Sequence, residues 1–455
     1  MHSRSERPSW FSLLLVLVGT ALSPGPQLPN ALADHPIPAE EFTLPNGLHV
    51  MMHEDHRYPF IAVNVQYRTG IINEPPGYSG ISAVIDSLMW RWGGQLWPYS
   101  AGYYLSQNGS SNVGSQRDLD THSTFELIPK INIETALWVE SERMSDLLPN
   151  AWEWDRETVP DLAADNIVKR QESQPYLVAY ENLWHALFPI SHPYHFRVVG
   201  SPGEIRKITL REAEKYYDQF YSPNNATLVV AGDFQPSAMR SLITDYFGDL
   251  SRRKPVSPSR IQANLPHGTI QLRHNETLGT FPVVTMAWLT PAREEREDAM
   301  ADFIALLLVR GRVGRLNRLF EPTTDVFALS ATRVSASGSS VFIITVAVAT
   351  ENVLATVNMK IEEELRKIRE EGVTRDEIDA IVRWDRNIAL EHIHSLDGKA
   401  SLLQQRASSR KSAQGEQNPL HRFDRIMTSE VSNFVRNYLG PQKIVQYITP
   451  QQTTN

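Results

Sequence analysis

Apolar residues recur along the chain with two periodicities, one typical of helices and one typical of strands, which together predict a mixture of both. Residues 80–92 give the clearest helical signal. Their apolar members lie three and four positions apart, as Ile81, Val84 and Ile85 show. Residues 60–68 alternate between apolar and polar positions instead, which is typical of a half-buried strand. The same patterns predict strands within 42–52, with a turn at 46–47, and at 119–127, 226–231, 269–272, 282–288, 341–348 and 443–448, and helices at 133–148, 155–174, 209–221, 296–320, 354–371 and 374–384.

An internal repeat divides the chain into two similar parts. Thr209 opens a helix that runs to a Tyr-Ser-Pro sequence and a strand, and Thr428 opens a second helix that ends before a proline and a strand. Thr428 follows Thr209 by 219 positions. Residues 252–266 are rich in proline and poor in apolar residues, which indicates a linker. We therefore expect an α+β protein with domains at 39–251 and 267–450.

Composition narrows the class of protein. The 455 residues are 41% apolar and 21% charged, as in ordinary globular proteins. The formal net charge is −8 and there is no basic block, so nucleic acid is not an expected partner. Cysteine is absent, which excludes disulfides, thiolate metal sites and a cysteine nucleophile.

The N-terminus has the features of a secretory signal peptide. Arg4 and Arg7 precede an apolar run at 10–22, and Ala31-Leu32-Ala33 forms a cleavage site. We predict a signal peptide at 1–33, with an uncleaved anchor as the alternative. Cleavage would leave a protein secreted across the inner membrane, periplasmic in our interpretation, with no integral membrane span.

Four motifs in order resemble one known family. They are Leu44-Pro-Asn-Gly47, the helix frame at 80–89, His192-Pro-Tyr194 with Val198-Val-Gly200, and Tyr221-Ser-Pro-Asn-Asn-Ala-Thr-Leu-Val-Val-Ala-Gly-Asp233. Each is weak alone, but their order and spacing over nearly the whole mature chain are specific. The sequence resembles the pitrilysin/insulinase family of zinc peptidases, which includes mitochondrial processing peptidase. The resemblance implies two homologous domains, each a mixed β-sheet packed with helices.

The resemblance also implies that the zinc site of this family has been lost. The family carries an H-x-x-E-H motif, which supplies two zinc ligands and a general base from one helix. These positions hold Ala83, Asp86 and Ser87, and the third ligand position falls on Val168. Catalytic zinc needs three protein ligands. We therefore expect no metal and no cofactor in this chain.

Two further family features concern the substrate. The second domain of the family supplies an arginine and a tyrosine that grip the substrate, and these positions hold Phe320 and Phe327. An edge strand of the first domain pairs with extended substrate, and Asn112 matches an asparagine in that strand. Two interpretations of 109–112 stay open: a surviving peptide-binding edge and a solvated Ser/Gly turn.

Histidines and aromatic residues elsewhere have plainer interpretations. We expect His192 and His195 to be structural, because two loop histidines lack a third ligand. His53 and His56 are expected at a solvated strand end. An aromatic cluster after the helix at 80–92 predicts core packing, with an interface as the alternative. Its members are Trp90, Trp92, Trp97, Tyr99, Tyr103 and Tyr104.

The preferred hypothesis is a non-catalytic subunit of a secreted zinc-peptidase heterodimer, in which an active homologue carries the zinc and peptide is the substrate. The alternatives are a stand-alone periplasmic peptide-binding or scaffold protein and, less favoured, an active zinc peptidase with a displaced site. The last would need a new ligand set.

Overall fold

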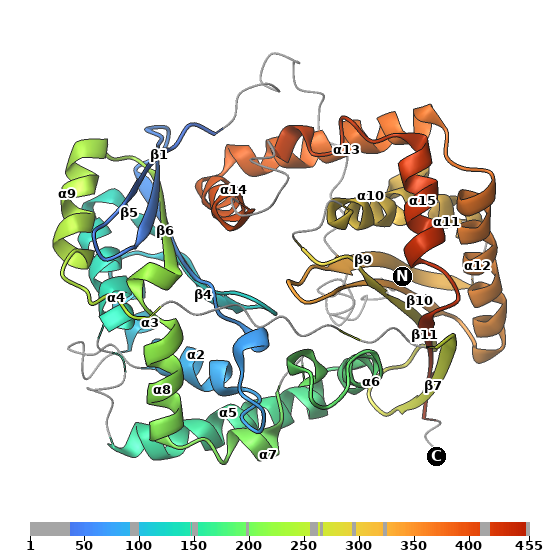
Figure 1. The fold of residues 1–455 in the computed structure, drawn as a ribbon, viewed down its shortest axis with the longest axis horizontal. Coiled ribbons are helices and arrows are strands. Elements are labelled where there is room, and N and C mark those ends of the chain that lie inside the picture. Colours follow the sequence, from blue (N-terminus) through green and yellow to red (C-terminus); the bar gives the residue numbers. More distant parts are fainter. Residues whose placement is uncertain are drawn as a thin grey trace, which may run out of the picture.

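The computed structural model describes residues 37–451 except 92–99, 146, 148–152, 197–199, 255–262, 264–266, 294–296, 322–324 and 410–418. The predicted signal peptide and most of the predicted linker lie outside the described residues. Two mixed sheets, one from each half of the chain, lie side by side and are surrounded by helices (Figure 1).

The first sheet has six strands in the order β1-β2-β6-β3-β5-β4. β2 and β6 are parallel and the other neighbouring pairs are antiparallel. Every residue of β6 is buried, which accounts for its continuous apolar sequence. The predicted turn at 46–47 joins β1 to β2, and Gly47 has the left-handed φ of 95° that such a turn needs. The strands are β1 (Glu40–Thr43), β2 (His49–Glu54), β3 (Phe60–Tyr67), β4 (Ser111–Arg117), β5 (His122–Pro129) and β6 (Ala226–Gly232).

The second sheet repeats this topology in the order β7-β11-β8-β10-β9. β7 and β11 are parallel, as β2 and β6 are, and the remaining pairs are antiparallel. β9 is thus the counterpart of β4 at the sheet edge, and β1 has no counterpart. The predicted pair of homologous α+β domains is confirmed. The strands are β7 (Thr269–Glu276), β8 (Val283–Thr290), β9 (Val326–Val334), β10 (Ser340–Val348) and β11 (Lys443–Pro450).

The predicted helices form, two of them with different bounds, and α3, α6, α7, α9 and α14 form where the sequence patterns predicted no helix. The predicted helix at 296–320 is divided into α10 and α11, because Gly311 between them takes a left-handed φ of 49°. The helix predicted at 374–384 continues to His394, since neither Gly nor Pro interrupts it. The helices are α2 (Ile81–Arg91), α3 (Ala101–Gln107), α4 (Ile133–Ser145), α5 (Glu153–Ser173), α6 (Leu177–Leu187), α7 (Pro202–Ile205), α8 (Leu210–Phe220), α9 (Pro236–Phe247), α10 (Asp298–Val309), α11 (Arg315–Phe320), α12 (Leu354–Glu370), α13 (Arg375–His394), α14 (Leu396–Ser409) and α15 (Thr428–Tyr438).

The two halves exchange one helix each. α6, from the first half, packs on β7 and β11 of the second sheet, and α14, from the second half, packs on β3 and β6 of the first. Leu403 of α14 is buried against Val229 and Met51 of the first sheet. Trp184 of α6 is buried with Ile343 of the second sheet. Each buried side chain of this kind contributes about 1.5–3 kcal/mol, so the exchange joins the halves firmly.

Polar contacts reinforce the docking of α14 and correct one expectation. The Lys399 ammonium of α14 lies 2.8 Å from His53 Nε2 and donates to Asp55 at 2.6 Å. His53 is buried, so the expectation of a solvated strand end is wrong for this residue. His56 is exposed, as expected, and bonds Glu54 and Asp233. Burial is the largest influence on the pKa of His53 and lowers it.

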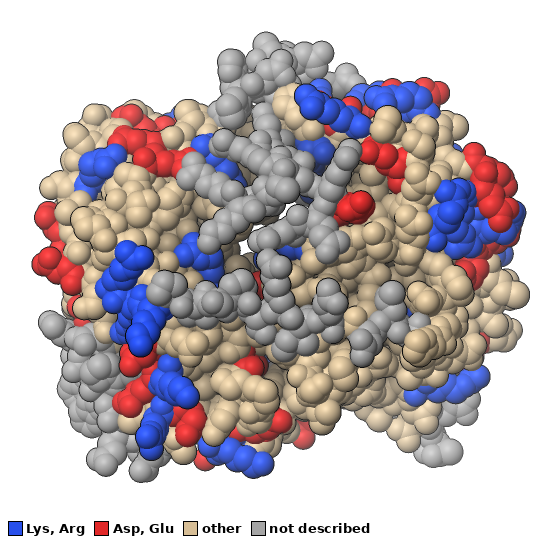
Figure 2. Space-filling view, viewed as in Figure 1, with Lys and Arg blue, Asp and Glu red and all other residues tan. Residues whose placement is uncertain are grey.

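Charged side chains of both signs are distributed over the surface. On the face shown in Figure 2, Lys and Arg are interspersed with Asp and Glu, and the described residues there form no continuous basic field. Such a mixed surface is typical of a globular protein.

Candidate functional site

α2 carries the three positions at which the resemblance places zinc chemistry. Ala83 is buried and Ser87 is half-buried, one turn apart on the helix. The Ser87 hydroxyl donates to the Ala83 carbonyl oxygen at 2.9 Å. A methyl group and a hydroxyl engaged with the backbone do not fit the imidazole positions of a zinc site.

The start of α2 is fixed by a buried carboxylate. Glu74 accepts hydrogen bonds from the backbone N–H of Gly80 at 2.8 Å and from the Ser82 hydroxyl at 2.5 Å. A negative group at a helix N-terminus satisfies free N–H groups and the helix dipole. Burial raises the pKa of Glu74. Gly80 has a left-handed φ of 94°, and a Cβ there would lie 2.4 Å from Ile205 Cδ1, so a larger residue would be strained at this position.

Asp86 is held by side chains that come from the β4–β5 hairpin. Its Oδ1 lies 3.1 Å from His122 Nε2, and its Oδ2 lies 3.5 Å from Arg117 Nε. Burial raises the pKa of Asp86, but hydrogen bonds from His122 and Ser115 and the charges of His122 and Arg117 outweigh it, so the net pKa is well below its usual range. Asp86 is therefore a fixed anion.

The hairpin presents Arg117 and His122 as cross-strand partners. Both side chains reach Asp86 from the sheet because directly opposite residues of an antiparallel pair lie on one face. His122 is fully buried, and its Nδ1 lies 2.8 Å from the Tyr221 hydroxyl. The imidazole is thus engaged at both nitrogens, and the Asp86 cluster is tied to the core.

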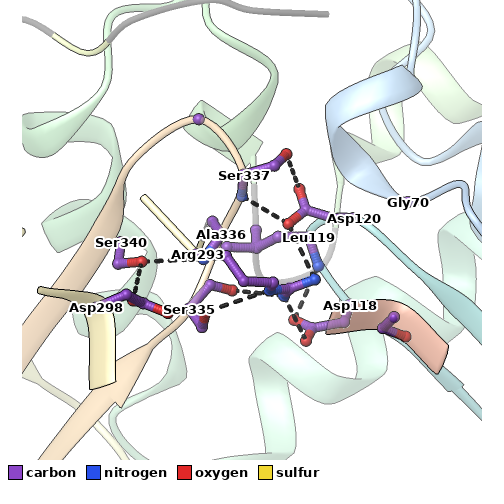
Figure 3. Close-up of polar contacts among 12 residues, drawn as sticks. Gly70, Asp118, Leu119, Asp120, Arg293, Asp298, Ser335, Ala336, Ser337 and Ser340 are labelled. Atoms are coloured by element: carbon purple, nitrogen blue, oxygen red, sulfur yellow. Dashed lines mark hydrogen bonds and ion pairs between the residues drawn. The ribbon is translucent and has the colours of Figure 1, made fainter. Parts of the chain in front are cut away.

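The turn between Arg117 and His122 is clasped between the two domains (Figure 3). Asp120 accepts from the backbone N–H of Ser337 at 2.7 Å and from its hydroxyl at 2.9 Å. Arg293 lies 3.3 Å from Asp120 and 4.0 Å from Asp118. On the other side, a Cβ at Gly70 would lie 2.5 Å from the Asp118 carbonyl oxygen. The close approach of Gly70 and the clasp by the second domain hold the hairpin end in place.

The third ligand position is Val168 on α5, which packs against α2. Val168 is half-buried and offers no donor. Asp165 pairs with Arg206 at 2.6 Å, and Asp161 lies 3.8 Å from the same arginine. Within the described ranges, no group of three or more His, Asp and Glu side chains could hold a metal ion. The described side chains do not fit a zinc ion.

Comparison with known proteins gives matches in sequence and in fold. A family model described as "Peptidase M16 inactive domain" matches residues 207–383. The Helicobacter pylori protein named zinc protease PqqE is 23% identical over 377 residues, which cover 81% of this chain and 82% of that protein. A solved protease from Helicobacter pylori has a TM-score of 0.83 at 20% identity and covers 91% of this chain and 100% of that one. The chain belongs to the pitrilysin family of peptidases. It is a member without the family's catalytic site.

Two further matches concern a longer protein. The Escherichia coli protein named probable zinc protease PqqL is 22% identical over 284 residues, 58% of this chain and 29% of that protein. The solved structure of the periplasmic protease PqqL from Escherichia coli has a TM-score of 0.70 at 14% identity, and covers 91% of this chain but 48% of that one. This pitrilysin-family chain therefore has the fold of about half of PqqL.

The two pitrilysin grip positions have different surroundings in the second domain. Phe320, at the end of α11, is 4% exposed and belongs to the domain core. Phe327 lies on the edge strand β9, is 50% exposed and packs on Phe281 at 4.8 Å between ring centroids. Neither phenyl ring can donate a hydrogen bond to a developing oxyanion.

The pitrilysin edge strand is present as β4. The strand begins at Ser111, and Gly109 before it takes a left-handed φ of 79°. Asn112 has a φ of 47° within an irregular register, and its amide donates to Asp397 of α14 at 2.9 Å. A substrate-binding role for Asn112 stays a prediction.

The remaining candidates have structural roles. The His192 imidazole accepts from the backbone N–H of Tyr194 at 3.1 Å, and His195 Nδ1 lies 2.7 Å from the Phe188 carbonyl oxygen, as expected for a structural turn. Trp90 donates to the Ser115 hydroxyl at 2.8 Å. Of the aromatic cluster, Trp92, Trp97 and Tyr99 lie outside the described residues. Across the described part of the chain, no helix is long and apolar enough to cross a membrane.

Sequence reasoning missed Arg117 and His122 as members of the site. The pattern at 119–127 predicts a strand but gives no sign that its first residues face α2. Only the pairing of β4 with β5, which the sequence pattern does not show, brings both side chains to Asp86.

Asp86→Asn should lower the melting temperature at pH 7, because it leaves Arg117 and His122 without their anion. We expect a loss of about 2 kcal/mol, below the 3–5 kcal/mol typical of fully buried pairs, since Asp86 is 21% exposed. The folded pKa of Asp86 is depressed, so this stabilisation is present above about pH 4 and is lost as the pH falls further. The difference between wild type and variant should therefore shrink from pH 7 to pH 3.

Asp161→Asn is the matched control, because Asp161 is 66% exposed and lies 3.8 Å from Arg206. Its melting temperature should follow the wild type at both pH values. An Asp86→Asn difference that is equal at pH 7 and pH 3 would contradict the ionised role of Asp86.

Proposed function

We propose that the chain is the non-catalytic subunit of a secreted zinc-peptidase heterodimer and forms one wall of its peptide-binding chamber. The observation that carries the proposal is the state of α2. The fold around the H-x-x-E-H frame is kept, while Ser87 bonds Ala83 and Asp86 is engaged by His122. Such a chain can still contribute surface and an edge strand to a site whose chemistry lies elsewhere.

The relative lengths support a two-part assembly. PqqL is a single chain of which our chain covers 48%, and the separately solved first half of PqqL also matches, with a TM-score of 0.68 at 15% identity. In our proposal a second chain supplies the other half of the chamber. That partner would be a homologue with an intact H-x-x-E-H motif, and the zinc would be bound there.

The proposed location is the periplasm. It rests on the signal-peptide pattern at 1–33. The relative PqqL from Escherichia coli is named as a periplasmic protease, which agrees with this location. Peptide is the proposed substrate of the assembly, as the names of the relatives suggest.

The test is to mix this chain with the homologue that is encoded nearest to it and carries H-x-x-E-H. We expect the two to co-elute in size-exclusion chromatography, with an interface above about 1,000 Å². Hydrolysis of a fluorogenic peptide should require both chains and should be abolished by replacing the partner's zinc-binding histidines. Ser87→Ala in this chain should leave the activity unchanged, since that hydroxyl bonds only the helix backbone.

The contrary result is no co-elution and no change in the homologue's activity. It would favour a stand-alone peptide-binding or scaffold protein. Phe320 and Phe327 support that alternative. A non-catalytic subunit that completes its partner's site would be expected to keep the family's arginine and tyrosine, and this chain has phenylalanine at both positions.

A further inference from the structure

A histidine and a lysine face each other where α14 docks on the first sheet. α14 belongs to the second half of the chain and lies against β3 and β6 (Figure 1). The Lys399 ammonium approaches His53 Nε2 at 2.8 Å, and both residues are buried. An ammonium group has hydrogens to donate and no lone pair. His53 Nε2 must therefore accept, which requires a neutral imidazole.

The other ring nitrogen of His53 fixes the same tautomer. Its Nδ1 lies 2.7 Å from the Pro38 carbonyl oxygen, which can only accept a hydrogen bond. The ring proton is thus on Nδ1, and the lone pair of Nε2 is directed at Lys399. A second proton would have to be placed on Nε2, where it would meet the ammonium group instead of an acceptor.

The charges around His53 give little compensation for a second proton. Lys399 donates to Asp55 at 2.6 Å, and Asp55 also accepts from Nε and Nη2 of Arg57, at 2.9 and 2.7 Å. One carboxylate thus already serves two cations. The residue paired with His53 on β6 is Ala231, which carries no charge. Protonation of His53 would place a third positive charge around this single buried carboxylate.

Other polar contacts of α14 respond to acid differently. Gln404 donates to Ser123 and accepts from Asn64, at 3.1 Å each, and amides and hydroxyls keep the same charge in acid. Asp397, in the first turn of α14, accepts from Asn112 at 2.9 Å, and burial raises its pKa. Acid would neutralise this carboxylate and remove the cost of its burial. The sign of the pH response therefore distinguishes it from the histidine.

We propose that His53 is a pH-sensitive switch for the docking of α14, and so for this attachment between the two domains. At neutral pH the imidazole accepts from Lys399 and the helix is docked. In acid, Nε2 takes up a proton from solvent and its hydrogen bond with Lys399 is lost. The like charges of the two groups then oppose each other, and α14 is released from the first sheet. This inference does not depend on the proposed function.

The direction of the pH dependence follows from the docked and released states of the imidazole. Burial lowers the pKa of docked His53 and the charge of Lys399 lowers it further, although the Pro38 carbonyl raises it in part. A released, solvated ring has an ordinary pKa of about 6.5. The released state thus binds the proton more tightly, so docking is undiminished above about pH 6.5 and weakens as the pH falls below it. Hydrogen bonds from Arg57 hold the pKa of Asp55 well below its usual range, so this carboxylate stays ionised.

The experiment follows amide hydrogen exchange of the full chain at pH 7.5 and pH 5. Mass spectrometry of peptides from α14 gives the observed exchange rates, and division of the intrinsic rate at each pH by the observed rate gives a protection factor. We expect the protection of α14 to fall about tenfold between pH 7.5 and pH 5. α9 packs on the opposite face of the first sheet and should keep its protection, which separates release of α14 from global unfolding (Figure 1).

Two variants assign the response to the facing pair. His53→Gln should leave α14 protected at pH 7.5 and remove the fall at pH 5, since the amide oxygen accepts from Lys399 and takes up no proton. Lys399→Met should also remove the fall, because a protonated His53 would then face Asp55 without the ammonium group. His56→Gln is the matched control. This neighbouring histidine is exposed and bonds two carboxylates of the first domain, so its variant should keep the wild-type response.

An equal fall in protection in the wild type and in His53→Gln would overturn the proposal, as would wild-type protection that is the same at both pH values. Should His53→Gln leave α14 unprotected throughout, Lys399→Met decides. A retained acid response in that variant contradicts the switch, and a lost response supports it. None of these results affects co-elution with an active homologue, which tests the proposed function.

Discussion

Four substitutions, Ala83→His, Asp86→Glu, Ser87→His and Val168→Glu, should convert the chain into one that binds about one zinc ion. Histidines four positions apart share a face of α2, and α5 packs against that helix with Val168 half-buried. We expect a zinc Kd of about 1 μM or tighter, equivalent to about 8 kcal/mol. Zinc at 100 times this concentration should then stabilise the variant by about 2.7 kcal/mol.

The same variant should remain without efficient peptidase activity. Phe320 is buried and Phe327 is apolar, so no grip on the substrate from the second domain is restored. A missing donor to the oxyanion costs about 10²–10³-fold in rate in other enzymes. The measurements are metal analysis, a zinc-dependent melting curve and peptide hydrolysis. Substantial turnover by the variant alone would show that the second domain has been misassigned, and failure to take up zinc would show that Val168 is not the third position.

Gly70→Ala should destabilise the protein strongly. The added methyl group would lie 2.5 Å from the Asp118 carbonyl oxygen, 2.6 Å from that of Leu119 and 2.7 Å from the Asp120 nitrogen. All three are backbone atoms of the clasped turn, so relief requires the turn to move. We expect a loss of about 3 kcal/mol and a melting temperature lower by roughly 5 °C or more.

Gly203→Ala is the matched control for this prediction. A Cβ at Gly203 would meet nothing within 4 Å, and this exposed residue of α7 has no left-handed φ to preserve. Its melting temperature should equal or slightly exceed that of the wild type. If Gly70→Ala and Gly203→Ala have the same melting temperature, the turn is not held in place as described.

Local patterns predicted much of the fold because they report local physics. The capping box that begins at Thr209 forms, with the Glu212 carboxylate accepting from the Thr209 backbone N–H at 3.1 Å. The box at Thr374 forms as well, with Glu377 accepting from its N–H at 2.9 Å. The helix at 80–92 followed from periodicity, and the two similar domains followed from the internal repeat. The loss of the zinc site from that helix was implied by the family resemblance.

The exchange of α6 and α14 could not be predicted in this way. An amphipathic pattern shows that a helix buries one face but not which sheet covers it. Lys399 illustrates the point, because it lies in the second half of the sequence and is buried against His53 and Asp55 of the first. Long-range contacts of this kind also turned His53 from an expected surface residue into a buried one.

The sequence predicted that the zinc-binding histidines of the candidate site are missing, but it did not predict the contacts that Asp86 makes instead. The absence of both histidines is visible in the sequence at Ala83 and Ser87. The anchoring of Asp86 by Arg117 and His122 depends on the register of β4 against β5. Register is set by the pairing of whole strands. The residues near 117 and 122 therefore do not predict which positions of β4 and β5 lie opposite each other.

The zinc content of the purified wild-type chain tests the central claim most directly. The protein is incubated with excess zinc, dialysed and examined by metal analysis, with its melting temperature measured before and after a chelator. The loss of both imidazoles on α2 predicts well below stoichiometric zinc and a melting temperature that the chelator leaves unchanged. Close to one tightly held zinc ion per chain, with a melting temperature that falls on chelation, would contradict it.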